Sequence, residues 1–485
     1  MLASRRQEMI ASRPRPAAGS EGAGGPRACW WGHGLAGSLV VVTATAILAQ
    51  PPAPARHTPR RVLHGVRSAW LQCAGEQPPP VTDLDVRQAP ALAEPPARTP
   101  FRDPVFGSCV VRVTDRIHDR TPDDRQGGLK NEYSRVQAFN ADQSRLLLRS
   151  TVATWYLYDA ATLHPLRRVE FSGEEPRWHP SDPQVFFYFQ DTQLRAFDLG
   201  RDEDLLVHDF AGDFPGQTLS LVWTRWEGSP SRDGRWFGLL AQDQGYEAVA
   251  LLVYDRWADR VTAVRDLRGV PNPTPDSATI SPSGTYLVAQ FEYCERGTTG
   301  TLARPCGLMV YDRSLASARG LARIIGHSDF AFDAQGREVL VFQDVDSDEV
   351  AMVDLESGAR TALFPIDFSG AAHGFHFSGR AFDRPGWVVV STYSGGHPHS
   401  VSWLDDQVFL VELRPGGRVV RLAHTRSRVD PSHEHDYWAE PQATANRDLT
   451  RILFTTNWGR SGTDEVETMM IVLPPNWPER GAEGP

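Results

Sequence analysis

Histidine is concentrated in the last third of the chain, where it could bind a metal ion or transfer protons. Three short stretches carry it: His373-Gly-Phe-His376, His397-Pro-His399 and His433-Glu-His435. Imidazole together with carboxylate or amide oxygen is an ordinary ligand set for zinc, manganese or a related divalent metal. None of these spacings is a strong metal motif, and histidines in polar loops are commonly exposed to solvent. Both interpretations stay open, and we favour exposure for the histidines in polar loops.

Other catalytic signatures are missing from the sequence. It contains no Gly-x-Ser-x-Gly elbow, no phosphate-binding Gly-Lys-Ser/Thr loop and no EF-hand series of acidic residues. Lys130 is the only lysine, so Schiff-base chemistry would depend on that one residue. The formal net charge of -10 argues against nucleic acid as a partner, because phosphate binding needs a concentrated basic face.

A repeated β-sheet unit must position the chemically capable residues. Residues 277–290, SATISPSGTYLVAQ, predict two antiparallel strands joined by a tight turn. The pattern occurs seven times, with turns at residues 140–143, 180–183, 231–234, 281–284, 333–336, 382–386 and 446–449. A third apolar run follows every copy and a fourth follows all but the last. The repeat length of about 40 to 60 residues is typical of a propeller blade.

The last copy lacks a fourth strand, because the sequence reaches Pro474-Pro475 first. Residues 109–115 predict an extra outer strand ahead of the first copy. We expect this strand to pair with the last blade and close the ring, which leaves no long unpaired edge at the join. The predicted fold is therefore all-β, a seven-bladed β-propeller over residues 103–478.

In such a propeller, the residues just before and on the innermost strand of each blade face a central channel. Those positions hold Tyr133, Arg135, Glu175, Arg177, Trp223, Arg225, Asp276, His327, Asp329, His373, His376, Glu440 and Gln442. This mixed-charge funnel suits a sugar, a peptide end or a divalent cation. The alternative is that pairs such as Glu175 and Arg177 only neutralise each other along the channel.

The first hundred residues predict no folded domain. Residues 1–50 include the apolar run 35–49 and indicate a signal peptide or a single membrane anchor. Residues 51–102 predict a disordered Pro/Ala-rich linker, and residues 479–485 a disordered tail. We expect a secreted or periplasmic monomer with no membrane contact beyond that first segment. An oxidising compartment favours a Cys294–Cys306 disulfide, and Cys73–Cys109 as the weaker pair.

The repeats at 276–312 and 331–354, with Ser281-Pro-Ser-Gly-Thr-Tyr286, resemble the WD40-like repeats of TolB-type propellers in exported bacterial proteins. A narrower resemblance is to oligogalacturonate lyase. That family of seven-bladed propellers holds a divalent metal with histidines and a glutamine in its channel and cleaves oligogalacturonides by β-elimination.

The stretch 437–448 resembles the part of the lyase family where a glutamine precedes a His-Pro-His metal pair. Tyr437 stands at the glutamine position, and Glu440 and Gln442 stand at the two histidine positions. His373 matches the remaining histidine ligand. The resemblance therefore implies a changed metal site, whose oxygen donors suit a harder ion such as manganese or calcium.

Two functions of different classes follow from the sequence. The first is a binding module that recognises a carbohydrate, a cell-wall component or a protein partner at the channel mouth. Its predicted ligand-binding residues are Tyr133, Arg135, Glu175, Arg177, Arg225, Asp276, His327, Asp329, Tyr437 and Glu440. The second is a metal-dependent polysaccharide lyase, with His373, His376 and Gln442 as metal ligands and Glu440 as a further ligand or acid/base group.

Overall fold

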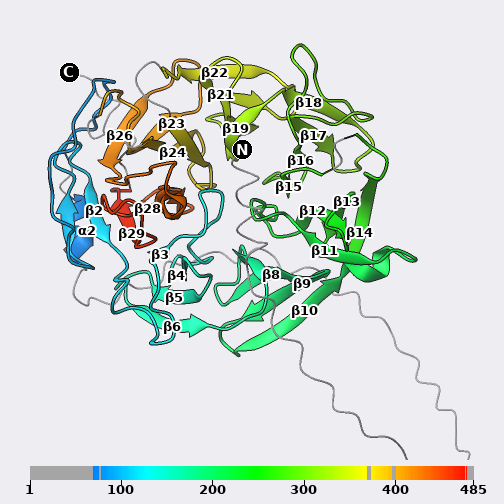
Figure 1. Ribbon diagram of the computed structural model, residues 1–485, viewed down its shortest axis with the longest axis horizontal. Helices are drawn as coiled ribbons and strands as arrows, with labels where there is room; N and C mark the ends of the chain where they lie inside the picture. Colours follow the sequence, from blue (N-terminus) through cyan, green and yellow to red (C-terminus); the bar gives the residue numbers. More distant parts are fainter. Residues whose placement is uncertain are drawn as a thin grey trace, which may run out of the picture. The chain divides into compact units, whose positions relative to one another are not determined.

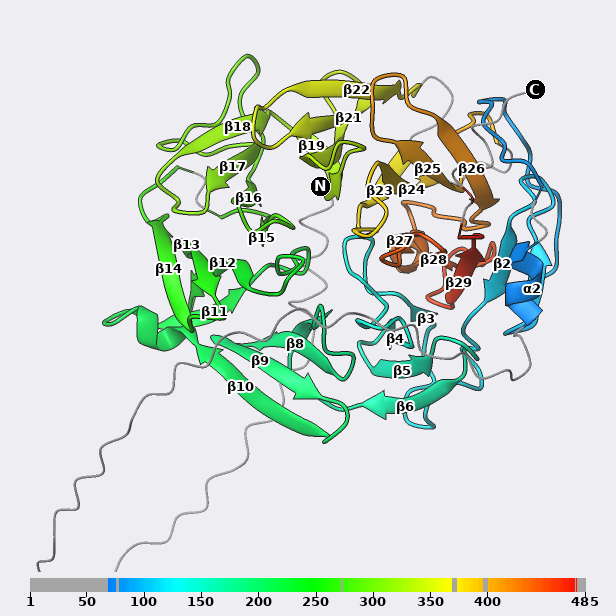
Figure 2. The ribbon, with the colours of Figure 1, turned by 180° about the vertical axis from the view of Figure 1, so that it is seen from behind.

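Seven antiparallel sheets are arranged in a ring around a central axis (Figure 1). The computed structural model describes residues 69–75, 78–271, 274–368, 373–395, 400–475 and 477. All of them belong to one unit, residues 67–485. Each blade runs from an inner strand beside the axis to an outer strand at the rim (Figures 1 and 2). The predicted all-β, seven-bladed propeller is confirmed.

Blades 1 to 6 each contain four strands in sequence order. Blade 1 consists of β3 (Leu129–Lys130), β4 (Arg145–Ser150), β5 (Trp155–Asp159) and β6 (Pro165–Val169). Blade 2 consists of β7 (Glu174–Trp178), β8 (Val185–Gln190), β9 (Gln193–Asp198) and β10 (Glu203–Asp209). Blade 3 consists of β11 (Leu219–Trp223), β12 (Trp236–Asp243), β13 (Ala248–Asp255) and β14 (Arg260–Asp266).

Blade 4 consists of β15 (Ser277–Ile280), β16 (Tyr286–Gln290), β17 (Leu308–Asp312) and β18 (Ala318–Ala322). Blade 5 consists of β19 (Ile325–Phe332), β20 (Glu338–Asp344), β21 (Glu349–Asp354) and β22 (Arg360–Pro365). Blade 6 consists of β23 (His373–Ser378), β24 (Trp387–Ser394), β25 (Gln407–Glu412) and β26 (Val419–His424). Two 3-10 helices, η1 (Phe210–Asp213) and η2 (Glu434–Ala439), lie in connections.

Blade 7 is assembled from both ends of the described chain. Its order is β27 (Thr444–Ala445), β28 (Arg451–Thr456), β29 (Glu467–Val472), β2 (Cys109–Arg112) and β1 (Pro100–Arg102). Strand β2 is antiparallel to β29, with Val110 opposite Ile471. The predicted closure is confirmed, and β1 adds a fifth strand from residues that the sequence assigns to the linker.

Burial follows the position of each strand within its blade. All residues of β13 and β29 are buried, because a middle strand packs against the neighbouring blades on both faces. The outer strand β14 instead alternates exposed and half-buried residues along its whole length. The hydrophobic core is therefore divided among the interfaces between neighbouring blades.

The outer strand β26 is the exception, since every one of its residues is buried. Residues 81–88 lie along it: Val81 forms a bridge with Arg421, and the Arg421 guanidinium donates to the Asp85 carbonyl at 2.6 Å. The His424 ring nitrogen Nε2 lies 3.0 Å from the Arg87 carbonyl oxygen. This part of the predicted linker 51–102 is thus ordered against blade 6, while residues 51–68 lie outside the described residues.

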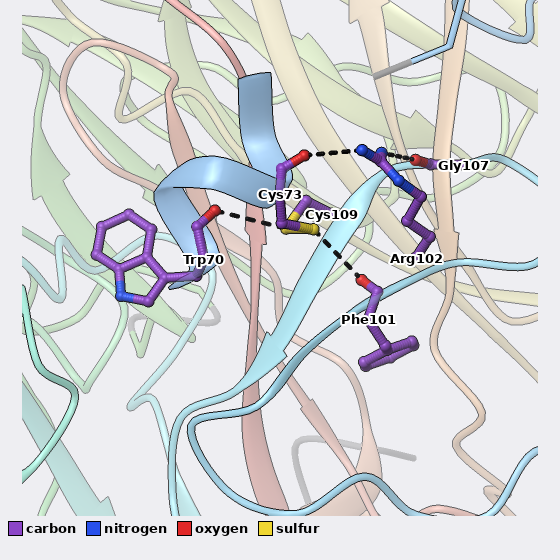
Figure 3. The surroundings of a disulfide bond; sticks show 6 residues. All are labelled: Trp70, Cys73, Phe101, Arg102, Gly107 and Cys109. Atoms are coloured by element: carbon purple, nitrogen blue, oxygen red, sulfur yellow. Dashed lines mark hydrogen bonds between the residues drawn. A yellow bond between two sulfur atoms is a disulfide. The ribbon is translucent and has the colours of Figure 1, made fainter. Parts of the chain in front are cut away.

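Both predicted disulfides are present. Cys73–Cys109 joins the short helix α2 (Ala69–Gly75) to β2, and Arg102 donates to the carbonyls of Cys73 and Gly107 at 3.0 Å each (Figure 3). Cys294–Cys306, with a Cα–Cα distance of 4.9 Å, closes the excursion between β16 and β17. The first bond ties the N-terminal segment to the strand that closes the ring.

None of the helices in the described part of the chain has the length and apolar composition that a bilayer span requires. The predicted signal peptide or anchor, residues 1–50, and the predicted tail, residues 479–485, lie outside the described residues.

Removing the disulfides should lower the free energy of unfolding according to the length of chain that each one closes. The chain-entropy relation gives about 4 kcal/mol for Cys73→Ala/Cys109→Ala and about 3 kcal/mol for Cys294→Ala/Cys306→Ala. Urea denaturation of the two double variants and the oxidised parent measures both losses. Unchanged midpoints in both variants would contradict the assigned pairing.

Candidate functional site

A buried imidazole–carboxylate pair lies on the channel side of blades 6 and 7. His376, on the inner strand β23, has its Nε2 at 2.9 Å from the Glu440 carboxylate, which precedes β27. His376 is fully buried and Glu440 is 5% exposed. Hydrogen bonding from His376, and its charge when protonated, hold the pKa of Glu440 below its usual value in spite of burial. Glu440 is therefore an ionised acceptor at neutral pH.

A second pair packs directly against the first. The Tyr133 hydroxyl lies 2.7 Å from Nδ1 of His327, and the His327 and His376 rings pack edge to face with centroids 4.4 Å apart. Burial, followed by the neighbouring His376, lowers the pKa of His327 to about 3. Its ring is consequently neutral at physiological pH.

A β-bulge places His327 in this position. The register between β19 and β20 shifts between Ile325 and Ser328, so His327 stands outside the regular ladder. Tyr133 comes from the irregular stretch that follows β3. These residues, far apart in sequence, meet because the inner edges of blades 1, 5 and 6 converge on the axis (Figure 1).

Aromatic rings form the accessible side of the cluster. Tyr393 stacks on His376 with centroids 5.8 Å apart, and Tyr437 contacts Trp438 with centroids 5.2 Å apart. Tyr393, Tyr437 and Trp438 are half-buried. Burial, and then its hydrogen bond with Glu440, raises the pKa of Tyr393 well above its usual value. Two histidines, two tyrosines and a carboxylate thus lie together, and we name Tyr133, His327, His376, Tyr393 and Glu440 the mouth cluster.

The predicted metal ligands have separate partners. His373 and His376 lie three residues apart on β23, so their side chains point to opposite faces of the strand. His373 Nε2 binds Asp405 at 2.6 Å. Gln442 accepts a hydrogen bond from the ammonium group of Lys130 at 2.7 Å.

A divalent metal does not fit this donor set. His376 would have to leave Glu440, and the Gln442 oxygen would have to leave the Lys130 ammonium. In the described part of the chain, no three His, Cys, Asp or Glu side chains are grouped to hold a metal ion. Lys130, the only lysine of the sequence, is buried. Its ammonium group contacts Gln442, which stands at a position where the resemblance to the lyases implies a metal-binding histidine.

Three buried ion pairs fill the channel beyond the mouth cluster. Arg177 pairs with Glu132 at 2.9 Å, Arg135 pairs with Glu227 at 3.0 Å, and Arg380 makes a bidentate contact with Asp329. We name these six residues the ion-pair layer. The cavity left beside Arg135 and Asp329 measures about 10 Å³, which is about the smallest space that holds one water. Little free space remains beside these two side chains.

Other predicted ligand-binding residues have structural roles. Glu175, at a positive φ of 60°, accepts hydrogen bonds from the backbone N–H groups of Thr224 and Trp226 and from the Thr224 hydroxyl. Arg225 donates to the Pro275 carbonyl, and the Asp276 N–H donates to the Gln290 carbonyl at 2.6 Å. Glu175 and Arg177 therefore bind different partners, contrary to the pairing considered from the sequence.

Several site residues were missed by sequence reasoning. Glu132, Glu227 and Arg380 lie in connections next to the inner strands, where the repeat gives no register. Tyr393 belongs to β24, the second strand of its blade. The one sequence feature that pointed to this region was that Lys130 is the only lysine. His397 and His399 lie outside the described residues, whereas His433 and His435 are exposed, as we favoured.

The comparisons with known proteins support the fold. No family model matches the chain, and no curated protein matches it. An oligogalacturonate lyase from Vibrio parahaemolyticus superposes with a TM-score of 0.55 at 11% identity, covering 78% of this chain and 97% of that one. This similarity shows a common propeller architecture.

Two further solved structures are less similar. The β-propeller domain of Cps50 (Swd1) from Myceliophteria thermophila gives a TM-score of 0.43 at 13% identity, covering 71% of this chain and 98% of that one. Hydrazine synthase from Kuenenia stuttgartiensis gives 0.41 at 13% identity, covering 72% and 97%.

Glu175 should lower the free energy of unfolding as the pH rises. An ordinary ion-paired carboxylate has the opposite effect. Burial raises its pKa from 4.5 to about 7, although Arg177 and the hydrogen bonds favour the ionised form. The folded state therefore holds this proton more tightly than the unfolded state. The contribution is fully present below pH 4.5 and is lost as the pH rises to about 7, a change on the order of 3 kcal/mol.

The measurement is urea denaturation at pH 5 and pH 8 for the parent and for Glu175→Gln. Between pH 5 and pH 8, the free energy of unfolding should fall more in the parent than in Glu175→Gln, because the glutamine does not titrate. An equal dependence on pH in both proteins would contradict the assignment.

Proposed function

We propose that this protein is a secreted or periplasmic binding module that recognises a carbohydrate at the mouth of its propeller channel. The mouth cluster is the observation that supports this proposal. It combines the ionised carboxylate of Glu440 with the half-buried ring of Tyr393, and it lies at the convergence of several blades. Two further half-buried rings, Tyr437 and Trp438, precede Glu440 in the chain.

The chemistry of a sugar suits this arrangement. A sugar ring has an apolar C–H face, which packs on aromatic rings such as Tyr437 and Trp438, and hydroxyl groups, which donate to a carboxylate such as Glu440. The neutral His327 ring and the Tyr393 hydroxyl add hydrogen-bonding groups without adding positive charge. This composition favours hydroxyl-rich ligands over strongly anionic ones.

The cysteines support export. Four cysteines of the described residues form two disulfides, and such bonds persist in oxidising compartments outside the cytoplasm. Sugars of cell walls and of the surroundings are the carbohydrates that a protein meets there.

Binding should depend on Glu440. Replacing Glu440 with Gln removes the charged acceptor, and we expect at least a tenfold weaker affinity for a responsive oligosaccharide in titration calorimetry. Asp405→Asn is the matched control, because Asp405 forms the other buried imidazole–carboxylate pair, with His373. That control should bind within about twofold of the parent, because we do not expect Asp405 to contact the ligand. A hydrogen bond to a charged group contributes about 1.5 to 3 kcal/mol only when the ligand itself makes that bond.

Urea denaturation of both variants verifies that they are folded. Equal weakening by Glu440→Gln and Asp405→Asn would contradict a ligand role for Glu440. A panel of neutral and acidic oligosaccharides without any response would remove the carbohydrate proposal.

A second candidate function is a polysaccharide lyase that acts on uronic acid chains. The Tyr133–His327 pair supports it, because an unprotonated imidazole accepts a proton and a phenol hydroxyl donates one, although a pKa of about 3 makes His327 a weak base. In β-elimination, the base takes the proton on the carbon next to the carboxyl group. The bond to the neighbouring sugar oxygen breaks, a carbon–carbon double bond forms, and the leaving oxygen is protonated.

Incubation with pectin and related uronans tests this second candidate through the ultraviolet absorbance of unsaturated products. The lyase candidate predicts an absorbance increase that His327→Gln lowers at least a hundredfold, as expected for loss of a general base. The binding proposal predicts no increase with the parent protein. An increase that is unchanged in His327→Gln would contradict the acid/base assignment.

A further inference from the structure

We propose a second ligand site at the opposite end of the channel, which binds a compact oxyanion such as a carboxylate or phosphate group. It is a cavity of about 60 Å³ lined by Arg177, His179, Arg232, Arg380 and Arg447 together with neutral residues. We name it the arginine pocket. Its residues differ from the mouth cluster, so the inference does not rest on the proposed carbohydrate function.

The pocket is built where the inner strands end. His179 directly follows β7, Arg380 lies two residues beyond β23, and Arg447 lies two residues beyond β27. In the mouth cluster, in contrast, His327 lies near the beginning of β19 and Glu440 precedes β27. Tyr393 pairs with Gly374 at the beginning of β23, the strand that carries His376. The inner strands run in the same direction around the axis of a propeller, so strand beginnings and strand ends gather at opposite ends of the channel.

The ion-pair layer separates the two sites. Arg177 and Arg380 belong to this layer and also line the arginine pocket. Their charges are balanced by Glu132 and Asp329, both of which are buried. A ligand entering from this end would meet the layer as its floor and would not reach the mouth cluster.

Four arginines line the pocket, and the acidic partners of three of them lie outside its lining. None of its lining residues is acidic. Among the described residues Arg232 makes no ion pair, and its guanidinium packs on the Phe332 ring at 5.1 Å. Arg447 lies 3.4 Å from Asp383, which is exposed. For a chain with a net charge of -10, this local excess of arginine indicates an anionic ligand.

The pocket also offers a neutral donor. Nδ1 of His179 accepts hydrogen bonds from the backbone N–H groups of Ser181 at 3.3 Å and Asp182 at 3.0 Å. The ring proton therefore resides on Nε2, which is left as a donor. Guanidinium forks and an imidazole N–H together match the acceptor oxygens of a carboxylate or a phosphate group.

The size of the cavity limits the ligand. One water needs about 10 to 15 Å³ on this measure, so about 60 Å³ holds roughly four waters. That space accepts an oxyanion group. The pocket therefore suits the charged end of a larger molecule or a free small anion.

Titration calorimetry with inorganic phosphate and with acetate tests the proposal, and uncharged acetamide serves as the matched neutral probe. We expect the parent to bind at least one of the two anions and not acetamide. Arg232→Gln/Arg447→Gln should weaken that binding at least tenfold. Arg268→Gln is the control variant, because Arg268 is an exposed arginine paired with Asp266 at the end of β14.

The two anions distinguish the source of the oxyanion. Binding of phosphate alone assigns a phosphate group, and binding of acetate alone assigns a carboxylate. Glu440→Gln should retain anion binding, which separates this site from the mouth cluster. Three results would each overturn the proposal. They are that neither anion binds, that the double variant and the parent bind with equal affinity, or that Arg268→Gln loses as much affinity as the double variant.

Discussion

The pairing of β2 with β29 is the constraint on which the rest of the molecule depends. An open chain of six complete blades and one partial blade would expose the edge of β29, whereas β2 supplies its ladder partner and β1 extends the sheet. Closure brings the inner strand of blade 7 beside those of blades 1 and 6. The contact between Lys130 of blade 1 and Gln442 of blade 7 crosses the point where the ring closes.

Desolvation then decides how the channel is used. Charges removed from water must be paired, because an isolated buried charge costs several kcal/mol. Arg135, Arg177 and Arg380 satisfy this requirement with acids from other parts of the chain, and together they fill the middle of the channel. The polar residues of the middle therefore neutralise one another, and the two proposed ligand sites lie toward the ends of the channel.

The propeller architecture shared with an oligogalacturonate lyase does not by itself determine the polar groups of the channel. A fold positions residues, and the residues themselves determine the chemistry. In this chain an ammonium group contacts the Gln442 oxygen, and a carboxylate engages the channel histidine. The mouth cluster thus has the composition of a hydrogen-bonding and acid/base site.

The sequence by itself determined the seven repeats, the strands within them and the closing strand, predicted at 109–115 and found at 109–112, because period-two patterns and turn residues act locally. It also placed His327, His376 and Glu440 near the axis. Only the tertiary structure decided their partners. The separation of His373 from His376 follows from strand alternation, but the choice of Asp405 and Glu440 depends on how blades pack.

Glu132, Glu227 and Arg380 lie in connections that have no repeating register, so no sequence pattern could bring them into the ion-pair layer. The ordering of residues 81–88 along β26 likewise depends on Arg421, more than 330 residues away in the chain. Local patterns fix strands because neighbouring residues interact in every copy. Pairing across the channel is fixed by contacts between distant residues, and it exists only after the ring has formed.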